Sequence, residues 1–303
     1  MTTVQIGDAR VHKVVETERE PESFDFVFPR GNWEVCETNR ARLEGEHIDF
    51  DRRAMLMSFH SYVISHGGVN VLVDGCIGNT KNRTGPGVSR YFGTDYNLFH
   101  MRDTAYLMRL ADAGFPPESI DYVLCTHLHC DHVGWFTRLR DGAWEPTFKN
   151  ARYVFASKEF AAAQAAWQNN PEGPFERSFE DSVQPVATAG LVDLVQTDHE
   201  IRPGLFLEPA PGHTPGHVLI HLECGGDHGI FSGDVIHSPY QLLDPGVSPV
   251  YDANDFKQAR ATRDQLLQRI VGTNTTVFTA HFGESSCGSV IADAGGAYWF
   301  DFL

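Results

Sequence analysis

The sequence predicts an α/β protein in which strands and helices mix in both halves of the chain. Three observations predict this class. Short apolar runs of strand length recur along the chain, segments with helical spacing alternate with them, and several of the apolar runs end directly at a histidine or an aspartate. With 303 residues, of which 42% are hydrophobic and 21% charged, the chain is long and apolar enough to form one large folded domain.

The first third of the chain contains mainly strand signals. Alternating apolar and polar residues at 2–16 predict a pair of short strands. Residues 17–57 show no clear period but carry several aromatic side chains, so we expect a long ordered arm or loop. The apolar runs 61–65 and 70–74 are separated by a glycine pair and predict a hairpin, whereas the polar, glycine-rich residues 76–98 predict a mobile loop.

Helices and strands alternate through the rest of the chain. Apolar spacing predicts a helix at 104–113, which Gly114 and Pro116 end, and a short buried strand at 120–125. The same criteria predict further helices at 158–168 and 255–270, and further strands at 153–156, 205–208, 217–222, 230–232 and 276–280.

Composition and charge argue against several partners and compartments. The formal net charge of −16 and the scattered Lys and Arg oppose nucleic-acid binding, because a phosphate backbone would be repelled. No stretch approaches the roughly 20 apolar residues that cross a bilayer, and the start lacks the apolar core of a secretory signal. We therefore expect a soluble cytoplasmic protein without a membrane partner. The six cysteines lack metal-type or disulfide-type spacing and are expected to be free thiols.

The candidate chemistry lies directly after the strand predicted at 120–125, in the pattern His-x-His-x-Asp-His. His127 and His129 are two residues apart, so on extended backbone they face the same side and can bind one ion. Asp131 and His132 follow where the chain must turn into a helix, and this turn can direct both toward a second ion. A lone His-x-His pair would be explained as well by surface histidines. Four residues of this kind in one short stretch predict a metal centre, and imidazole and carboxylate suit zinc as well as iron, cobalt or manganese.

Three further candidate ligands each follow a predicted strand. His213 lies in Pro-Gly-His-Thr-Pro-Gly-His, Asp234 follows Ser-Gly, and His281 lies in Thr-Ala-His-Phe. The carboxyl ends of strands are where chemistry collects in layered α/β folds. This placement therefore favours a metal-binding role for all three.

In order, type and local context, these residues resemble the five motifs of the metallo-β-lactamase superfamily, over roughly residues 61–282. The resemblance implies a four-layer αββα sandwich, here a single domain over 1–303 with 17–57 as an N-terminal arm or loop. It also implies two divalent metal ions, with Zn2+ expected and Fe, Mn or Co as alternatives. By position it assigns His127, His129 and His213 to the first metal, Asp131, His132 and His281 to the second, and Asp234 as a bridge between both.

Two residues near the ligands are expected to support the metal site. Asp74 ends the second strand of the predicted hairpin and matches the family's first motif, an aspartate that supports the ligand loop. The alternative for Asp74 is a turn aspartate before Gly75. His217 lies four residues after His213, and the family's pattern makes it structural.

The resemblance also implies a hydrolytic mechanism. Two adjacent cations lower the pKa of a bridging water, so that a hydroxide attacks the substrate without a separate general base. A positioned acid must still protonate the leaving group. Asp131 and His237 are the candidate catalytic residues. Many homoserine lactonases carry a tyrosine three residues after the bridging aspartate, where this chain has His237; we expect His237 to contact the substrate or donate a proton, the alternative being a surface or supporting histidine.

Within the superfamily, the sequence around the ligands and at 252–267 most resembles the N-acyl-homoserine lactonase and methyl parathion hydrolase branches. The expected function is hydrolysis of a small lactone or ester, with phosphotriester, aryl ester or β-lactam hydrolysis as the alternative. A non-catalytic metal-binding protein or a di-iron redox protein is the competing class, which the complete ligand set disfavours. Glyoxalase II is disfavoured because its basic C-terminal region is missing, and ribonuclease Z because the chain is acidic.

Aromatic residues beside the ligands are candidates for the wall of the substrate pocket. Trp135 and Phe136 follow the ligand loop and Phe282 follows His281, although core packing is an equally good interpretation. The aromatic residues of 17–57 are candidates for a cover over the site or for a homodimer face. The expected partners are therefore a small-molecule substrate and a second copy of the chain.

Overall fold

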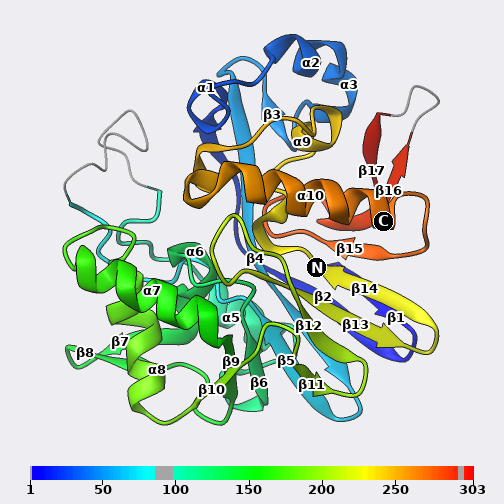
Figure 1. Cartoon of the computed structure of the whole chain (residues 1–303). Helices are drawn as coiled ribbons and strands as arrows, with labels where there is room; N and C mark the ends of the chain where they lie inside the picture. Colours follow the sequence, from blue (N-terminus) through cyan, green and yellow to red (C-terminus); the bar gives the residue numbers. More distant parts are fainter. Residues whose placement is uncertain (1, 86–97, 293–296) are drawn as a thin grey trace. The chain divides into compact units, whose positions relative to one another are not determined.

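The computed structural model of the chain describes residues 2–85, 98–292 and 297–303 (Figure 1). By its internal contacts the chain divides into two compact units. The first unit comprises Met1–Thr17 and Phe59–His199, and the second comprises Glu18–Ser58 and Glu200–Leu303.

The larger sheet contains, among the described residues, the strands β1 (Thr3–Ile6), β2 (Ala9–Ser23), β3 (Ile48–Asp49), β4 (Ala54–His66), β5 (Val69–Val73), β6 (Tyr122–Leu124), β9 (Arg152–Ala156) and β10 (Val192–Val195). Its order is β1-β2-β4-β5-β6-β9-β10, with β3 paired to β4. β4 and β5 form an antiparallel hairpin, whereas β5, β6, β9 and β10 run parallel. The carboxyl ends of β5 and β6 therefore lie at the same edge of the sheet, where Asp74 and Thr126 follow.

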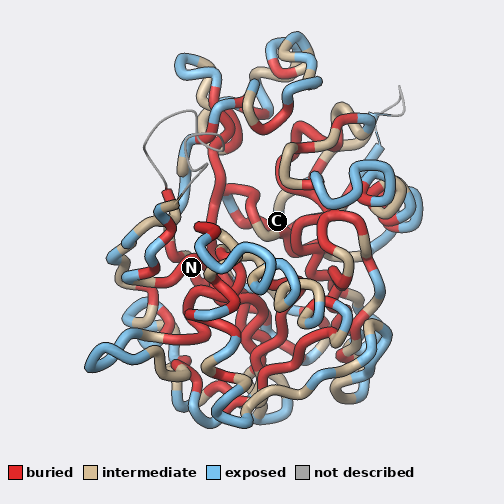
Figure 2. Tube along the Cα trace, turned by 60° about the vertical axis from the view of Figure 1, so that its left-hand side comes forward, coloured by how far each residue is buried: buried red, intermediate tan, exposed pale blue. Residues whose placement is uncertain are grey.

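Helices of the first unit pack on this sheet. They are α5 (Tyr106–Asp112), α6 (Cys130–Val133), α7 (Ser157–Asn169) and α8 (Gln184–Thr188), and a hairpin of β7 (Thr137–Arg140) and β8 (Ala143–Pro146) lies among them in sequence. Leu110 of α5 and Phe160 of α7 pack in one core with Val123 and Phe155 of the sheet. Figure 2 colours the buried parts of the chain red. Burying a side chain of this size stabilises a fold by about 1.5–3 kcal/mol, so this core holds the strand ends firmly in place.

The smaller sheet belongs to the second unit and contains, in spatial order, β11 (Glu200–Arg202), β12 (Leu205–Pro209), β13 (Val218–Cys224), β14 (Asp227–Phe231), β15 (Thr276–Phe278), β16 (Cys287–Ala292) and β17 (Tyr298–Phe302). β14 and β15 are parallel neighbours, so their carboxyl ends share one edge. The helix α10 (Phe256–Ile270) packs Leu266 and Ile270 in one core with Ile230 and Val277 of this sheet. The Asp255 side chain caps α10 by accepting from Gln258 N at 2.9 Å.

The second unit also includes the segment 18–58, which forms the short helices α1 (Phe24–Val27), α2 (Trp33–Thr38) and α3 (Arg40–Leu43). Phe24 and Phe28 are buried, and both rings lie 5.0 Å from the ring of Tyr240, in α9 (Tyr240–Leu243). Trp33 lies 5.0 Å from Phe24. These three aromatic residues thus pack within their own unit.

The predicted α/β class is confirmed. The helices expected at 104–113, 158–168 and 255–270 are α5, α7 and α10, within two residues at each end. Among the helices of the described ranges, none combines the length and the apolar character that a membrane span requires. Residues 86–97 of the loop predicted at 76–98 lie outside the described residues.

Candidate metal centre

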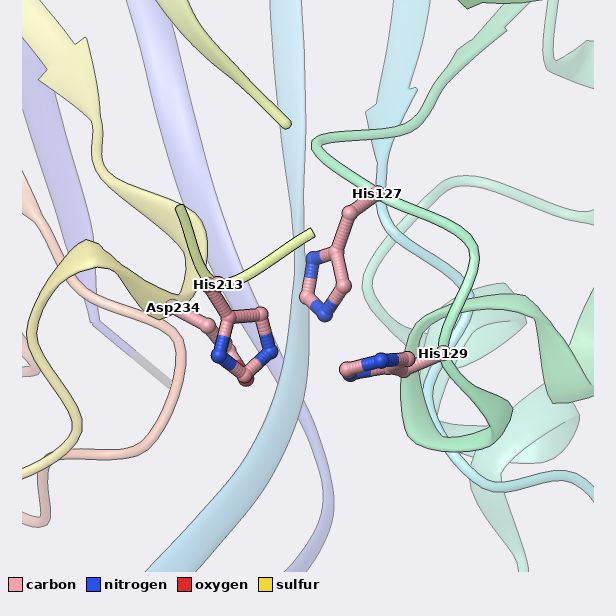
Figure 3. A group of neighbouring side chains, drawn as sticks. All are labelled: His127, His129, His213 and Asp234. Atoms are coloured by element: carbon pink, nitrogen blue, oxygen red, sulfur yellow. The ribbon is translucent and has the colours of Figure 1, made fainter. Parts of the chain in front are cut away.

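In the first unit, four candidate ligands lie on the loop and short helix that follow β6. His127 and His132 are buried. His129 precedes α6 as its N-cap residue, and Figure 3 draws it together with His127. The ring of His127 lies 4.6 Å from that of His129 and 4.1 Å from that of His132. Asp131 places Oδ2 3.8 Å from His132 Nε2. The local fold therefore gathers the whole His-x-His-x-Asp-His pattern into one cluster.

Asp74 orients this cluster from the end of β5. Its Oδ1 accepts from Thr126 N at 2.8 Å, and its Oδ2 accepts from Thr126 Oγ1 at 2.9 Å. Oδ2 also lies 3.0 Å from His132 Nδ1. A carboxylate at this nitrogen favours the tautomer that carries the proton on Nδ1, which leaves the Nε2 lone pair of His132 for a metal.

Close backbone packing fixes the position of α6. Gly134 N donates to Cys76 O at 2.8 Å, and Gly75 N donates to His132 O at 2.6 Å. A Cβ atom at Gly134 would lie 1.8 Å from Ile77 O, so only glycine allows this approach. The glycine after the ligand motif thus lets the ligand helix pack directly on the chain segment that follows Asp74.

Two buried glutamates that the sequence interpretation did not select also hold the ligand loop. Glu159 of α7 accepts from Leu128 N at 3.0 Å, between the two histidines of the His-x-His pair. Glu16 accepts from Ile77 N and from Trp135 Nε1, each at 2.7 Å, and burial raises its pKa despite these donors. Neither glutamate lies in a local sequence pattern that would have revealed it.

The three candidate pocket aromatics are buried in the cores of their units. Trp135 stacks on Tyr106 at 5.4 Å, and Phe136 stacks on Phe155 at 5.7 Å. Phe282 contacts Phe300 edge-on at 5.1 Å. These contacts agree with the core-packing interpretation of all three.

In the second unit, three histidines converge on the carboxylate of Asp234, which lies in a short turn after β14. Asp234 Oδ2 is 3.3 Å from His213 Nε2, and these two side chains are drawn in Figure 3. Oδ2 is also 3.2 Å from His237 Nε2, and Oδ1 is 3.1 Å from His281 Nε2. All four side chains are buried. Nε2 atoms gathered around one carboxylate form a donor set suited to a divalent metal.

His217 supports the backbone of this cluster. Its Nε2 accepts a hydrogen bond from Asp234 N at 3.1 Å, and its side chain is fully buried. A ring nitrogen that accepts from a backbone N–H has its lone pair occupied. The Nε2 atom of His217 is thus engaged in holding the Asp234 turn.

Acceptors also lie at the Nδ1 atoms of His281 and His213. His281 Nδ1 lies 3.2 Å from Ser58 O, and His213 Nδ1 lies 3.1 Å from Asp252 Oδ1. Asp252 was not selected from the sequence, although it opens the segment at 252–267. Burial raises the pKa of Asp252, and His237 and Arg263 oppose this effect.

The residues of each unit fit a divalent metal by one shared feature. His132, His213 and His281 each direct Nδ1 to an oxygen acceptor, which favours a proton on Nδ1 in all three. Neutral imidazoles and carboxylates then supply the nitrogen and oxygen donors that zinc and similar ions bind.

Comparisons with known proteins agree with this chemistry. The family model of the metallo-beta-lactamase superfamily matches residues 60–291. An N-acyl homoserine lactonase from Bacillus sp is 31% identical over 119 residues, which cover 39% of this chain and 39% of that protein. The chain thus matches about two fifths of the length of this curated relative.

Two solved structures share the fold. The hydrolase AbOPH, described as belonging to the beta lactamase superfamily, is 22% identical, with a TM-score of 0.76 and coverage of 99% of this chain and 96% of that chain. AidC, described as a dizinc quorum-quenching lactonase in complex with a product, is 18% identical, with a TM-score of 0.77 and coverage of 100% and 97%. At these identities the similarity concerns the fold, and it confirms the fold family expected from the motifs.

Proposed function

Because this chain belongs to the metallo-β-lactamase superfamily, we propose that it is a dinuclear metal-dependent hydrolase that opens a small lactone or a related ester. The observation that carries this proposal is the common orientation of His132, His213 and His281, whose Nδ1 atoms face oxygen acceptors. In metal sites, an acceptor at Nδ1 orients the ring so that Nε2 binds the cation.

The proposed ligand assignment follows the family's motifs. When bound, two adjacent divalent ions supply an activated water and polarise the substrate's carbonyl oxygen. Zinc is the proposed ion, since imidazole and carboxylate donors suit it and since the AidC structure is described as dizinc. The assignment has His127, His129 and His213 at one metal, Asp131, His132 and His281 at the other, and Asp234 at both.

The proposed substrate class rests on the curated relative and on one structural neighbour. The Bacillus relative is an N-acyl homoserine lactonase, and AidC is described as a quorum-quenching lactonase. A small-molecule lactone is therefore the first substrate to test. The homodimer and the cytoplasmic location expected from the sequence stay predictions.

His237 is the residue proposed to contact the substrate's leaving-group oxygen or to donate a proton to it. Its buried ring lies 5.5 Å from the ring of Tyr251, and its Nε2 lies 3.2 Å from Asp234 Oδ2. An imidazole beside the bridging carboxylate has the right chemistry to contact a substrate oxygen or to move a proton. His237→Ala is expected to lower kcat about 100-fold, within the usual contribution of a general acid, while the metal content stays unchanged. Wild-type kcat in this variant would refute the role.

The proposed function is tested on zinc-loaded protein with four substrates: an N-acyl homoserine lactone, an aryl ester, a phosphotriester and a β-lactam. We expect two zinc ions per chain and the highest kcat/KM on the lactone, with activity lost in Asp234→Ala. The exposed substitution Asp198→Ala is the matched control. Two bound metals with no turnover of any substrate would favour a metal-binding protein, and two irons with a visible absorption band would favour a redox protein.

A further inference from the structure

Asp252 carries a buried carboxylate that the metal assignment does not use. It lies in the short turn Val250–Asn254, directly before α10, and is fully buried. A buried carboxylate is costly unless charged or hydrogen-bonding partners compensate for the lost water. The partners of Asp252 therefore indicate why the fold keeps it there.

The two carboxylate oxygens of Asp252 face different partners. Oδ1 lies 3.1 Å from His213 Nδ1, and Oδ2 lies 3.5 Å from Nη1 of Arg263, which is itself buried. Arg263 Nη2 donates to Val247 O at 2.6 Å, and Nη1 also lies 3.4 Å from Val235 O, one residue after Asp234. Arg263 thus joins Asp252 to the turn that bears the proposed bridging ligand.

The same helix and turn also hold the backbone of the His213 loop. Thr262 Oγ1 donates to Pro211 O at 2.6 Å, and Asn254 Nδ2 donates to Gly212 O at 3.1 Å. Gly212 has φ +138°, and a Cβ atom there would lie 2.3 Å from the backbone of Ala259 in α10. The His213 main chain and the His213 ring are therefore both positioned from the segment 252–263.

We propose that Asp252, held by Arg263, is a positioning residue that fixes the His213 ring with its proton on Nδ1 and its Nε2 lone pair toward the metal. This inference rests on the proposed metal-binding function. It concerns only the protonation and the orientation of the His213 ring. Asp74 does the same for His132 in the first unit. Each unit thus contains one ligand histidine that is oriented by a buried aspartate.

The group His213, His237 and Asp252 admits a competing interpretation. One ligand atom of each lies within 4.8 Å of the others, which is a spacing that a metal ion could also use. If Asp252 were itself a ligand, removal of its charge would abolish one bound zinc. If Asp252 positions His213, both zinc ions remain and one binds more weakly.

The test compares wild type with Asp252→Asn, which keeps the shape of the side chain and removes its charge, and with the matched control Asp255→Asn. Asn also serves as a helix N-cap, so the control keeps the cap of α10. Zinc affinity is measured by competition with a chromophoric chelator. We expect a weakening of about 10- to 100-fold at one site in Asp252→Asn and wild-type affinity in the control, because outer-shell partners of metal ligands have effects of this size.

Two further readouts separate positioning from general damage to the fold. In zinc-loaded, 15N-histidine-labelled protein, the Nδ1 proton of His213 is expected to be hydrogen-bonded and slow to exchange in wild type, and faster to exchange in Asp252→Asn. Saturating zinc is expected to restore most of kcat in the variant with little change in KM. Unchanged affinity together with unchanged exchange of the Nδ1 proton would overturn the proposal, as would loss of one zinc at saturation. The Nδ1 proton is read without substrate, so its result stands even if the proposed hydrolase activity is refuted.

Discussion

His132 Nδ1 and Asp74 Oδ2 lie 3.0 Å apart, and the same carboxylate also accepts two hydrogen bonds from Thr126. Asp74→Asn keeps one acceptor oxygen but removes the charge that stabilises the Nδ1–H tautomer. We expect zinc affinity to fall about 10- to 100-fold, as for other partners of metal-binding histidines. Isothermal titration with zinc checks this, and Asp198→Asn, an exposed position, is the control. Equal affinities in the two variants would show that Asp74 only stabilises the turn.

His217 is expected to be needed for folding stability but not for metal stoichiometry. Its Nε2 accepts from Asp234 N at 3.1 Å, so His217→Ala leaves a buried backbone N–H without its acceptor. A loss of about 1–3 kcal/mol in the free energy of unfolding is expected from this change. Metal analysis of the variant should still find two ions per chain, whereas Asp234→Ala should bind fewer. Loss of one ion in His217→Ala would instead make His217 a ligand.

The sequence was most informative where chemistry and a strand end coincide. The residues 127–132 could be interpreted because four possible metal ligands follow one apolar strand. The helices α7 and α10 could be predicted because their apolar spacing extends over several turns. The helices of 18–58 are only four to six residues long, too short for a period to emerge. Phe24 and Phe28 are placed by contacts with Tyr240, more than 200 residues along the chain.

Two supporting residues of the site, Glu16 and Asp252, could not be found from local patterns. Glu16 and Asp252 act through partners that lie far away in sequence: Glu16 contacts Trp135, and Asp252 contacts His213. The residues next to Glu16 are those of an ordinary β-strand, so they give no indication of its role. The strands β7 and β8 were missed because their residues, mostly half-buried or exposed, lack the apolar alternation that marks a strand.

Gly134 is expected to be irreplaceable because of the backbone it faces. In Gly134→Ala the new Cβ would lie 1.8 Å from Ile77 O, so α6 or the 75–78 segment must move. Overpacking of this kind costs about 1–3 kcal/mol, and the shift of α6 should also weaken zinc binding. Gly246→Ala is the matched control, since a Cβ atom there would lie 3.6 Å from its nearest neighbours. Chemical denaturation and zinc titration check both variants, and equal stability of the two would mean that the ligand helix is not held by this contact.

Lys81 should make the stability of the protein depend on pH in the neutral to alkaline range. It is fully buried, its Nζ donates to Thr137 Oγ1 at 2.6 Å, and burial lowers its pKa from the ordinary value of 10.5 to about 7. Between these two values the unfolded chain holds a proton on this lysine that the folded chain lacks. Unfolding therefore takes up a proton, and the free energy of unfolding rises with pH by at most about 1.4 kcal/mol per pH unit from this group.

Lys81→Met removes this proton uptake, so the difference in unfolding free energy between wild type and variant should grow in favour of wild type from pH 7 to pH 9. Urea denaturation at several pH values measures this difference while other titrating groups cancel. Lys257→Met, at an exposed position of α10, should give a difference that does not change with pH. Parallel curves for wild type and Lys81→Met would mean that the lysine stays charged in the folded protein, with Asp181, whose Oδ1 lies 3.5 Å from Nζ, compensating its burial.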